Sequence, residues 1–381
     1  MKKIVVSSAL SALLVLPAAA FEVYNADDKK LDVYGSIRGF VGMGENTHKD
    51  TSTRNAAPFL FGVQNNSNFG VKFHADKFSA QVEIGAVESD PSLTTVSPLR
   101  LFWGSYDTGM GTILIGKAQT PTADTSFSND LWNNDMGSWG FGGVATSDRK
   151  LQAQYSVAGL SLALVNDYLA SGYGVSNEMP RIAVSYSVGD KANPVFKIAG
   201  AYKHYNPTAM TRGSLNAGNL DNNTGSNDAW HIFVGAKPTF GSSWLSLVAH
   251  YGKNAHIYGN QGTATNVGGW AHSSVSDGLT ALTEGISIKR SGGKVEFGTA
   301  LSKELSFIVG AGYQETFGNG TAGKFKGYTA FVQLPYKVSA NLTLSPQVGW
   351  YQQDNVATAN KPLTREPIAS VNGAVRVKWD F

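Results

Sequence analysis

The stretch from Ile368 to Phe381 constrains the fold more than any other part of the sequence. Every second residue is apolar or glycine, and the series ends in two aromatic residues: Val371, Gly373, Val375, Val377, Trp379 and Phe381. The intervening positions are polar or charged, apart from Ala374. Side chains on a strand point to alternate faces, so this pattern predicts a strand with one apolar and one polar face. Aromatic residues at the end of the apolar face are typical of a strand that reaches the interfacial girdle of a membrane β-barrel.

The same alternation recurs from residue 31 to the end of the chain, in sixteen segments separated by short and long gaps in turn. The short gaps are 75–77, 107–109, 158–159, 189–194, 239–243, 302–304 and 335–341, and the long gaps are 45–65, 88–98, 118–148, 169–180, 206–228, 253–293, 317–324 and 352–367. Outer-membrane barrels combine short periplasmic turns, long external loops and an even number of strands. We therefore predict an all-β fold, a 16-stranded antiparallel transmembrane β-barrel whose last strand pairs with its first. A further hairpin within 253–293 would give eighteen strands instead.

Composition excludes several other classes of protein. The chain has no cysteine, so it has neither a disulfide framework nor a cysteine metal site. A net charge of +3 without a basic run argues against nucleic-acid binding. The mean hydropathy of −0.15 argues against a bundle of membrane-spanning helices. We expect no cofactor and no bound metal.

The N-terminus has the three parts of a secretory signal. Lys2 and Lys3 are followed by an apolar run, Ile4 to Leu16, and by small residues around Ala18 to Ala20. The run is too short to span a bilayer. We predict a cleaved signal peptide at residues 1–20, a single barrel domain at residues 21–381, and export to the bacterial outer membrane. An uncleaved anchor is the alternative.

Short motifs in order along the chain resemble the general, non-specific trimeric porins of Gram-negative outer membranes. The segments that carry the resemblance are Val23 to Asn25, Lys30 to Gly35, Ser67 to Lys72, Arg100 to Gly104, Gly111 to Lys117, Leu301 to Lys303 and the terminal Phe381. No motif between Tyr205 and Lys294 matches firmly. The resemblance implies a water-filled channel for passive diffusion of small hydrophilic solutes and ions.

The same resemblance implies partners and assembly. It implies a homotrimer in which the second loop, with Glu88 and Asp90, latches onto a neighbouring subunit. It also implies contact with outer-membrane lipid and lipopolysaccharide. Trp379 and Phe381 would form the signal read by the barrel assembly machinery.

In the porins that the chain resembles, the third loop folds into the lumen and narrows it. The corresponding constriction loop here is 118–148, and its Phe141-Gly142-Gly143 resembles the end of the family's loop-tip pattern. Gly140 stands where that pattern usually has glutamate, so nearby aspartates are candidates to supply the acidic charge. The candidate loop residues are Asp124, Asp130, Asp135, Trp132, Trp139 and Phe141. The three aromatic residues either make the constriction apolar or only wedge the loop against the wall.

A row of basic residues on the inner wall is expected to face the loop. Strand parity places Arg38, Lys72 and Arg100 on the polar face, with Leu101 and Trp103 on the opposite face from Arg100. Three more candidates rest on other grounds. Lys150 shares a face with two glutamines, Arg149 has the wrong parity but sits at a strand end, and Lys117 matches a family arginine. The alternative for each of these six basic residues is a charge that lines the lumen or lies at the rim without a special role. Facing rows of opposite charge bias which ions enter a pore, and this balance favours anions.

Three other functions compete with a diffusion channel. An outer-membrane enzyme is not expected, because none of the seven histidines lies in a catalytic motif. A substrate-specific eighteen-stranded porin would show an aromatic track, which Trp132, Trp139 and Trp270 would begin. A non-conducting structural barrel would need a plugged lumen.

Overall fold

The computed structural model of the chain describes the residues that carry the fold. They are 21–26, 28–48, 59–64, 66–85, 99–131, 141–144, 148–167, 175–176, 179–190, 193–207, 227–255, 266–267, 270–271, 287–318, 325–354, 356–358, 361–364 and 368–381. Residues 1–20, where the signal peptide is predicted, lie outside this set.

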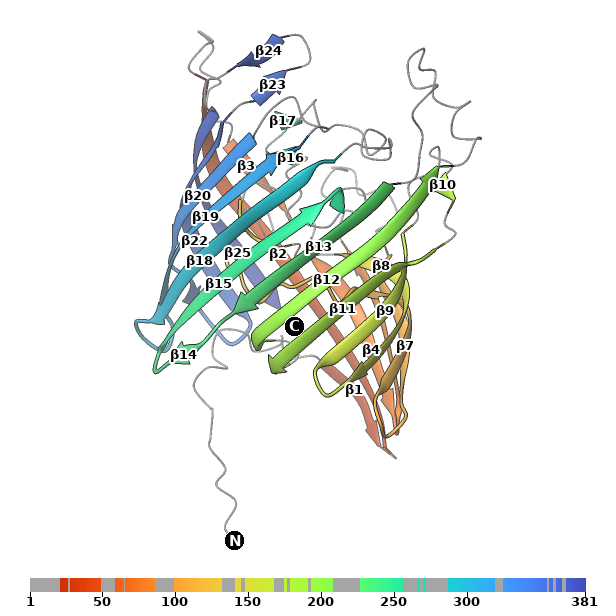
Figure 1. The fold of residues 1–381 in the computed structure, drawn as a ribbon. Helices are drawn as coiled ribbons and strands as arrows, with labels where there is room; N and C mark the ends of the chain where they lie inside the picture. The colour runs from red at the N-terminus through yellow and green to blue at the C-terminus, as the bar shows by residue number, and fades with distance from the viewer. Residues whose placement is uncertain are drawn as a thin grey trace.

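Across the described residues, sixteen strands form a closed antiparallel β-barrel, which confirms the predicted fold (Figure 1). In order they are β2 (Lys29–His48), β3 and β4 as one interrupted strand (Phe59–Val63 and Asn68–Ala75), β5 (Phe78–Gly85), β6 (Leu99–Asp107), β7 (Thr112–Gln119), β8 (Arg149–Val157), β9 (Leu160–Asn166), β11 (Arg181–Gly189), β12 (Pro194–Pro207), β13 (Asn227–Ala236), β15 (Ser243–Lys253), β18 (Lys289–Ala300), β19 (Ser306–Phe317), β20 (Phe325–Gln333), β22 (Leu342–Asp354) and β25 (Ile368–Asp380). The barrel closes where β25 pairs with β2, from Ser36↔Asp380 to His48↔Ile368.

The remaining strands are short and lie beside or outside this wall. They are β1 (Phe21–Ala26), β10 (Val175–Ser176), β14 (Thr239–Phe240), β16 (Asn266–Val267), β17 (Trp270–Ala271), β21 (Tyr336–Lys337), β23 (Val356–Thr358) and β24 (Lys361–Thr364). Strand β15 pairs directly with β18, so the predicted alternative, in which a hairpin within 253–293 adds two strands to the wall, is wrong. Strands β16 and β17 pair only with each other. None of the helical segments among the described residues is long and apolar enough to cross a membrane.

The two faces of the wall differ as the alternation predicts. On β25, Val371, Val377 and Trp379 are 39–54 % exposed on the outer face. Asn372 and Ala374, which alternate with them, are buried on the inner face. An apolar outer face and a polar inner face are the arrangement that a barrel needs in a bilayer.

Strand β1 was not predicted as a separate element, and it continues the seam of the barrel. It pairs with the first residues of β2, between Phe21↔Val33 and Ala26↔Lys29, next to the end of β25. Phe381 exchanges two backbone hydrogen bonds with Gly35, of 2.8 and 3.0 Å. A Cβ atom on Gly35 would collide with the Phe381 ring, so glycine allows this close approach. The chain end is thereby fixed to the first barrel strand.

Adjacent residues on β8 test the assignment of the two faces. Ala153 is exposed on the outer face between Ile115 and Leu164, whereas Gln154 lies on the inner face. Ala153→Arg is expected to destabilise the folded barrel by about 2–4 kcal/mol, because it places a charge near the middle of the lipid-facing surface. Gln154→Arg, the matched control, is expected to cost far less, since its charge reaches the lumen. Urea unfolding in lipid vesicles measures both, and equal losses would contradict the assignment.

Candidate functional site

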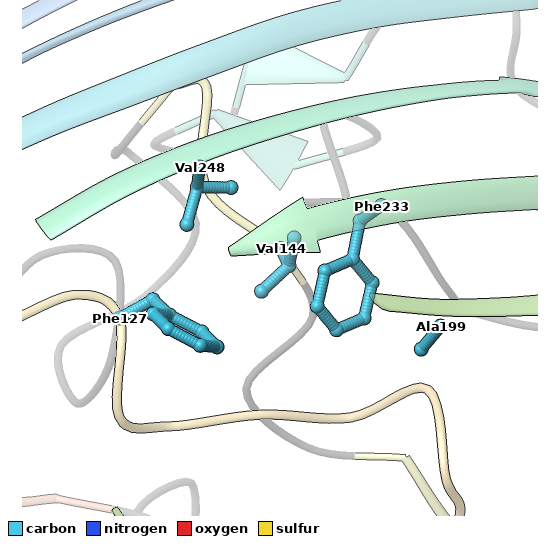
Figure 2. Close-up of a cluster of buried hydrophobic side chains, with 5 residues drawn as sticks. All are labelled: Phe127, Val144, Ala199, Phe233 and Val248. Atoms are coloured by element: carbon cyan, nitrogen blue, oxygen red, sulfur yellow. The ribbon is translucent and has the colours of Figure 1, made fainter. Parts of the chain in front are cut away.

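The segment between β7 and β8 lies against the inner face of the barrel wall. Figure 2 shows Phe127 and Val144 from this segment beside Ala199, Phe233 and Val248. The last three belong to β12, β13 and β15, and all five side chains are buried. An apolar contact of this kind holds the loop to the wall. The described parts of the third loop therefore lie inside the barrel, as the resemblance implied.

Asp130 anchors the loop to strands β18 and β22 of the wall. Its carboxylate is fully buried, and it lies 3.0 Å from Lys294 Nζ of β18. The Tyr351 hydroxyl and the Gln347 amide of β22 each donate a hydrogen bond of 2.8 Å to Asp130 Oδ1. Lys294 also lies 3.7 Å from Glu296. Buried charges persist only when they are paired and hydrogen-bonded in this way.

Asp124 makes a similar contact with β12. Its Oδ2 lies 2.8 Å from Lys197 Nζ, and both side chains are about nine-tenths buried. Lys197 Nζ also donates to the Ala123 carbonyl at 3.0 Å. We expected Asp124 and Asp130 to supply acidic charge at the constriction. The structure instead pairs both with wall lysines, so they hold the loop rather than present free negative charge to the lumen.

Phe141 fixes the returning half of the loop. Its side chain is 3 % exposed, and its backbone N–H donates to Thr329 Oγ1 at 2.7 Å. The ring packs against Gly327 so closely that a Cβ atom there would collide with it. This arrangement favours the wedge interpretation for Phe141. Trp132, Asp135 and Trp139 lie outside the described residues.

A double-mutant cycle tests the Phe141 wedge. Gly327→Ala is expected to destabilise the fold by about 1–3 kcal/mol, because the added methyl overpacks the contact with the ring. Combining it with Phe141→Ala removes the clash, so the two effects should not add. Chemical unfolding of the two single variants and the double variant gives the coupling. Additive losses would show that the ring and Gly327 are not in contact.

A buried ion cluster closes the base of the loop. Arg181, at the start of β11, lies 2.8 Å from Asp148 and 2.7 Å from Asp167. The Thr120 hydroxyl donates to Asp148 at 2.6 Å, which joins the two ends of the loop. Sequence reasoning missed Arg181, Lys197 and Lys294. The sequence pattern indicated that these residues face inward, but not which loop aspartates they pair with, because those aspartates are 33 to 164 residues away.

Five basic residues form a cluster on the inner wall, and three of them were predicted. The basic cluster consists of Arg38, Arg100, Arg149, Arg376 and Lys378. Arg149 is close enough to Arg38 and Arg100 to interact electrostatically with both, so we group it with them. Lys378 interacts in the same way with Arg38 and Arg376. Closure of the barrel brings these residues of β25 to the side of β2.

Two carboxylates accompany the basic cluster. Arg100 Nε lies 2.6 Å from Glu83 Oε1, and Lys378 Nζ lies 2.7 Å from Asp380 Oδ2. The Arg38 Nε donates to the Ser36 hydroxyl at 3.1 Å. Among the described residues, the cluster combines five cations with two carboxylates, so we infer that it carries net positive charge. Such a cluster attracts anions into a narrow aqueous space.

Arg100 faces inward for a reason that strand parity did not predict. The register shifts between Glu83 and Ile84, which pair with Leu101 and Leu99, so Arg100 is the extra residue of a β-bulge. Beyond the bulge the parity is reversed. Phe102 is 59 % exposed on the outer face, and Trp103 lines an inner-wall pocket. The prediction that Leu101 and Trp103 face outward is wrong.

The other predicted basic residues lie apart from the cluster. Lys72 is on the inner face, with Nζ 4.6 Å from the centroid of the Tyr34 ring. Lys150 interacts electrostatically with Asp167 at the loop base. Lys117 pairs with outward-facing Phe102, and its Nζ donates to the Leu99 carbonyl at 2.5 Å. The expectation that Lys117 belongs to the lumen wall is therefore not met, because the strand turns it to the other face.

Four predicted positions outside the pore remain, two in the assembly signal and two in the trimer latch. Trp379 is 54 % exposed on the outer face, and Phe381 is held by Gly35. Glu88 and Asp90, the predicted trimer latch, lie outside the described residues. Within the described part of the chain, no group of three or more histidine or acidic side chains is placed to hold a metal ion.

Comparisons with known proteins establish the fold. No protein-family model matches the sequence, and no curated protein matches it. Among solved structures, an anion-selective porin from Comamonas acidovorans is similar, with a TM-score of 0.62 at 13% identity over 93% of this chain and 100% of that chain. OmpF of Salmonella typhi, solved with daunomycin, has a TM-score of 0.57 at 16% identity over 94% of this chain and 100% of the other. The trimer form of OmpT, an outer membrane protein of Vibrio cholerae, has a TM-score of 0.54 at 14% identity over 93% and 100%. At these identities the likeness shows a shared fold, that of the porin-like outer-membrane β-barrel.

Proposed function

We propose that this chain forms a water-filled pore through which small hydrophilic solutes and ions diffuse passively across the outer membrane. The observation that carries the proposal is the division of the barrel wall into an apolar outer face and a charged inner face. The described parts of the third loop lie against one side of the wall, anchored by Asp124, Asp130 and Phe141. Such a pore transforms nothing. Its width and lining charges decide what passes.

We further propose that the pore prefers anions. The basic cluster carries net positive charge, whereas Asp124 and Asp130 are neutralised by Lys197 and Lys294. Two of the three loop carboxylates proposed for the constriction are thus engaged in holding the loop, and the third, Asp135, lies outside the described residues. One structural neighbour is itself named an anion-selective porin, although the shared fold alone does not transfer that property.

Location and assembly belong to the same proposal. We propose a homotrimer in the outer membrane, in contact with lipid and lipopolysaccharide, and a neighbouring structure with this fold is a trimer. The aromatic end of β25, with Trp379 and Phe381, is proposed as the signal for the barrel assembly machinery. Glu88 and Asp90 remain candidates for the contact between subunits. Residues 1–20 are proposed to be removed on export.

Swelling of proteoliposomes tests the proposed pore. Vesicles that contain the folded barrel are expected to swell in isotonic solutions of small sugars, with rates that fall as the solute grows. A plugged structural barrel would give the same low rate as vesicles without protein. That result, obtained with protein whose gel mobility still changes on heating, would contradict the proposal.

A further inference from the structure

The inner wall near the short turns contains a pocket that the pore mechanism does not require. Its volume is about 270 Å³, and it lies among β2, β4, β5 and β6. The side chains that give it chemical character are Lys30, Asp32, Lys72, His74, Gln81 and Trp103. We refer to it as the Trp103 pocket. A concave site with one aromatic residue and several convergent polar groups is the usual form of a small-molecule site.

Four side chains of this pocket form a single row across neighbouring strands. Asp32 pairs with Lys72, Lys72 with Gln81, and Gln81 with Trp103. Residues directly opposite one another on neighbouring strands share a face, so the four side chains stand next to each other on the inner wall. The bulge at Arg100 is what turns Trp103 into this row. Without the bulge, its indole would face lipid.

Three groups in the row are left with unused binding capacity. Asp32 Oδ2 lies 3.1 Å from Lys30 Nζ, but the buried Asp32 Oδ1 has no hydrogen-bond partner among the described residues. Lys72 Nζ lies over the Tyr34 ring and is exposed to the lumen. Trp103, which is partly exposed, presents a large apolar ring beside these charged and polar side chains. A buried acceptor without a donor and an apolar ring in water both cost free energy, which a bound ligand would recover.

We propose that the Trp103 pocket binds a hexose-sized sugar in its ring form, as a subsite within the proposed pore. A pyranose has hydroxyl groups that donate to the Asp32 carboxylate and oxygen atoms that accept from Lys72 and Gln81. Its flat C–H face matches the face of the indole, which carries partial negative charge. A small carboxylate fits less well, because it would bring a second negative charge to Asp32. An acyclic polyol offers the hydroxyl groups but not the flat face.

Calorimetric titration of the full-length folded protein tests this subsite whether or not the pore conducts. The detergent must lack a sugar headgroup, and the two probes are glucose and sorbitol, which have similar size and similar hydroxyl content. Glucose is expected to bind with a dissociation constant in the millimolar range, about tenfold more tightly than sorbitol. Equal affinity for the two, or no heat with either, would overturn the proposal.

Variants on one strand complete the test. Trp103→Ala is expected to weaken glucose binding about tenfold, whereas Trp103→Phe, which keeps a flat ring, should retain most of it. The matched control is Phe102→Ala, on the outer face of the same strand, which should leave binding unchanged. If Phe102→Ala weakens binding as much as Trp103→Ala, the effect is on folding and the subsite is wrong. If the protein conducts but binds no glucose, only the proposed subsite is contradicted. If it binds glucose but does not conduct, only the proposed pore is contradicted.

Discussion

Replacing Asp130 by alanine is expected to destabilise the barrel by about 3–5 kcal/mol, because it leaves Lys294 as a buried charge without its main partner. The substitution also removes the acceptor for Tyr351 and Gln347. Urea unfolding in lipid vesicles measures the loss. The part of the loop held by Asp130 should separate from β18 and β22, so the pore current is expected to become noisier.

A double variant separates the ion pair from other effects of the mutation. Asp130→Leu with Lys294→Met removes both charges of the pair and keeps similar volume, so it should recover part of the stability. The buried Glu296 loses its contact with Lys294 in this variant but keeps its hydrogen bonds from Ser128 and Asn129. Asp124→Ala is a second comparison and should cost less, because its pair with Lys197 is less deeply buried. A loss of under about 0.5 kcal/mol for Asp130→Ala, the size of an ordinary surface change, would contradict the proposed anchor.

Neutralising three members of the basic cluster is expected to remove the preference for anions. One unit charge about 4 Å from a passing ion contributes about 1 kcal/mol in water, or about fivefold in relative permeability. The variant Arg38→Gln/Arg149→Gln/Arg376→Gln should therefore lower the anion-to-cation permeability ratio by more than about tenfold. Arg100 is left in place, because its removal would strand the buried Glu83. Reversal potentials at low salt, where screening is weak, measure the ratio.

Lys117→Gln is the matched control for the charge variant. It removes one positive charge from the opposite face of the wall, where the side chain bonds to Leu99. The permeability ratio should not change. A control that shifts the ratio as much per charge as the triple variant would mean that the net charge of the protein, and not the basic cluster, sets the preference.

The barrel was predictable because face alternation is a local property of each strand. The series that ends in Trp379 and Phe381 was enough to predict two faces, and the alternating gap lengths were enough to predict the strand count. Because a closed barrel pairs its last strand with its first, the sequence could also have predicted that Arg376 and Lys378 belong to the basic cluster. They lie on the polar face of the last strand, which had to pair with the strand that carries Arg38.

The site was less predictable, since it depends on contacts between distant segments. One extra residue at Arg100 reversed the parity of Trp103, and the alternation of the sequence alone does not show where that residue is inserted. Asp130 is an acidic residue in the third loop, as expected, but its role is set by Lys294, which lies 164 residues away. Sequence alone gives the face of Lys294 and not the loop atom that reaches it.

Single-channel current across a planar bilayer under a salt gradient tests the central claim most directly. The folded chain is expected to insert in discrete conducting steps, grouped in threes if it is a trimer, with a reversal potential whose sign indicates preference for anions. A cation-selective sign would contradict the assignment of charge to the basic cluster and the loop. No current from folded, heat-modifiable protein would contradict the pore itself.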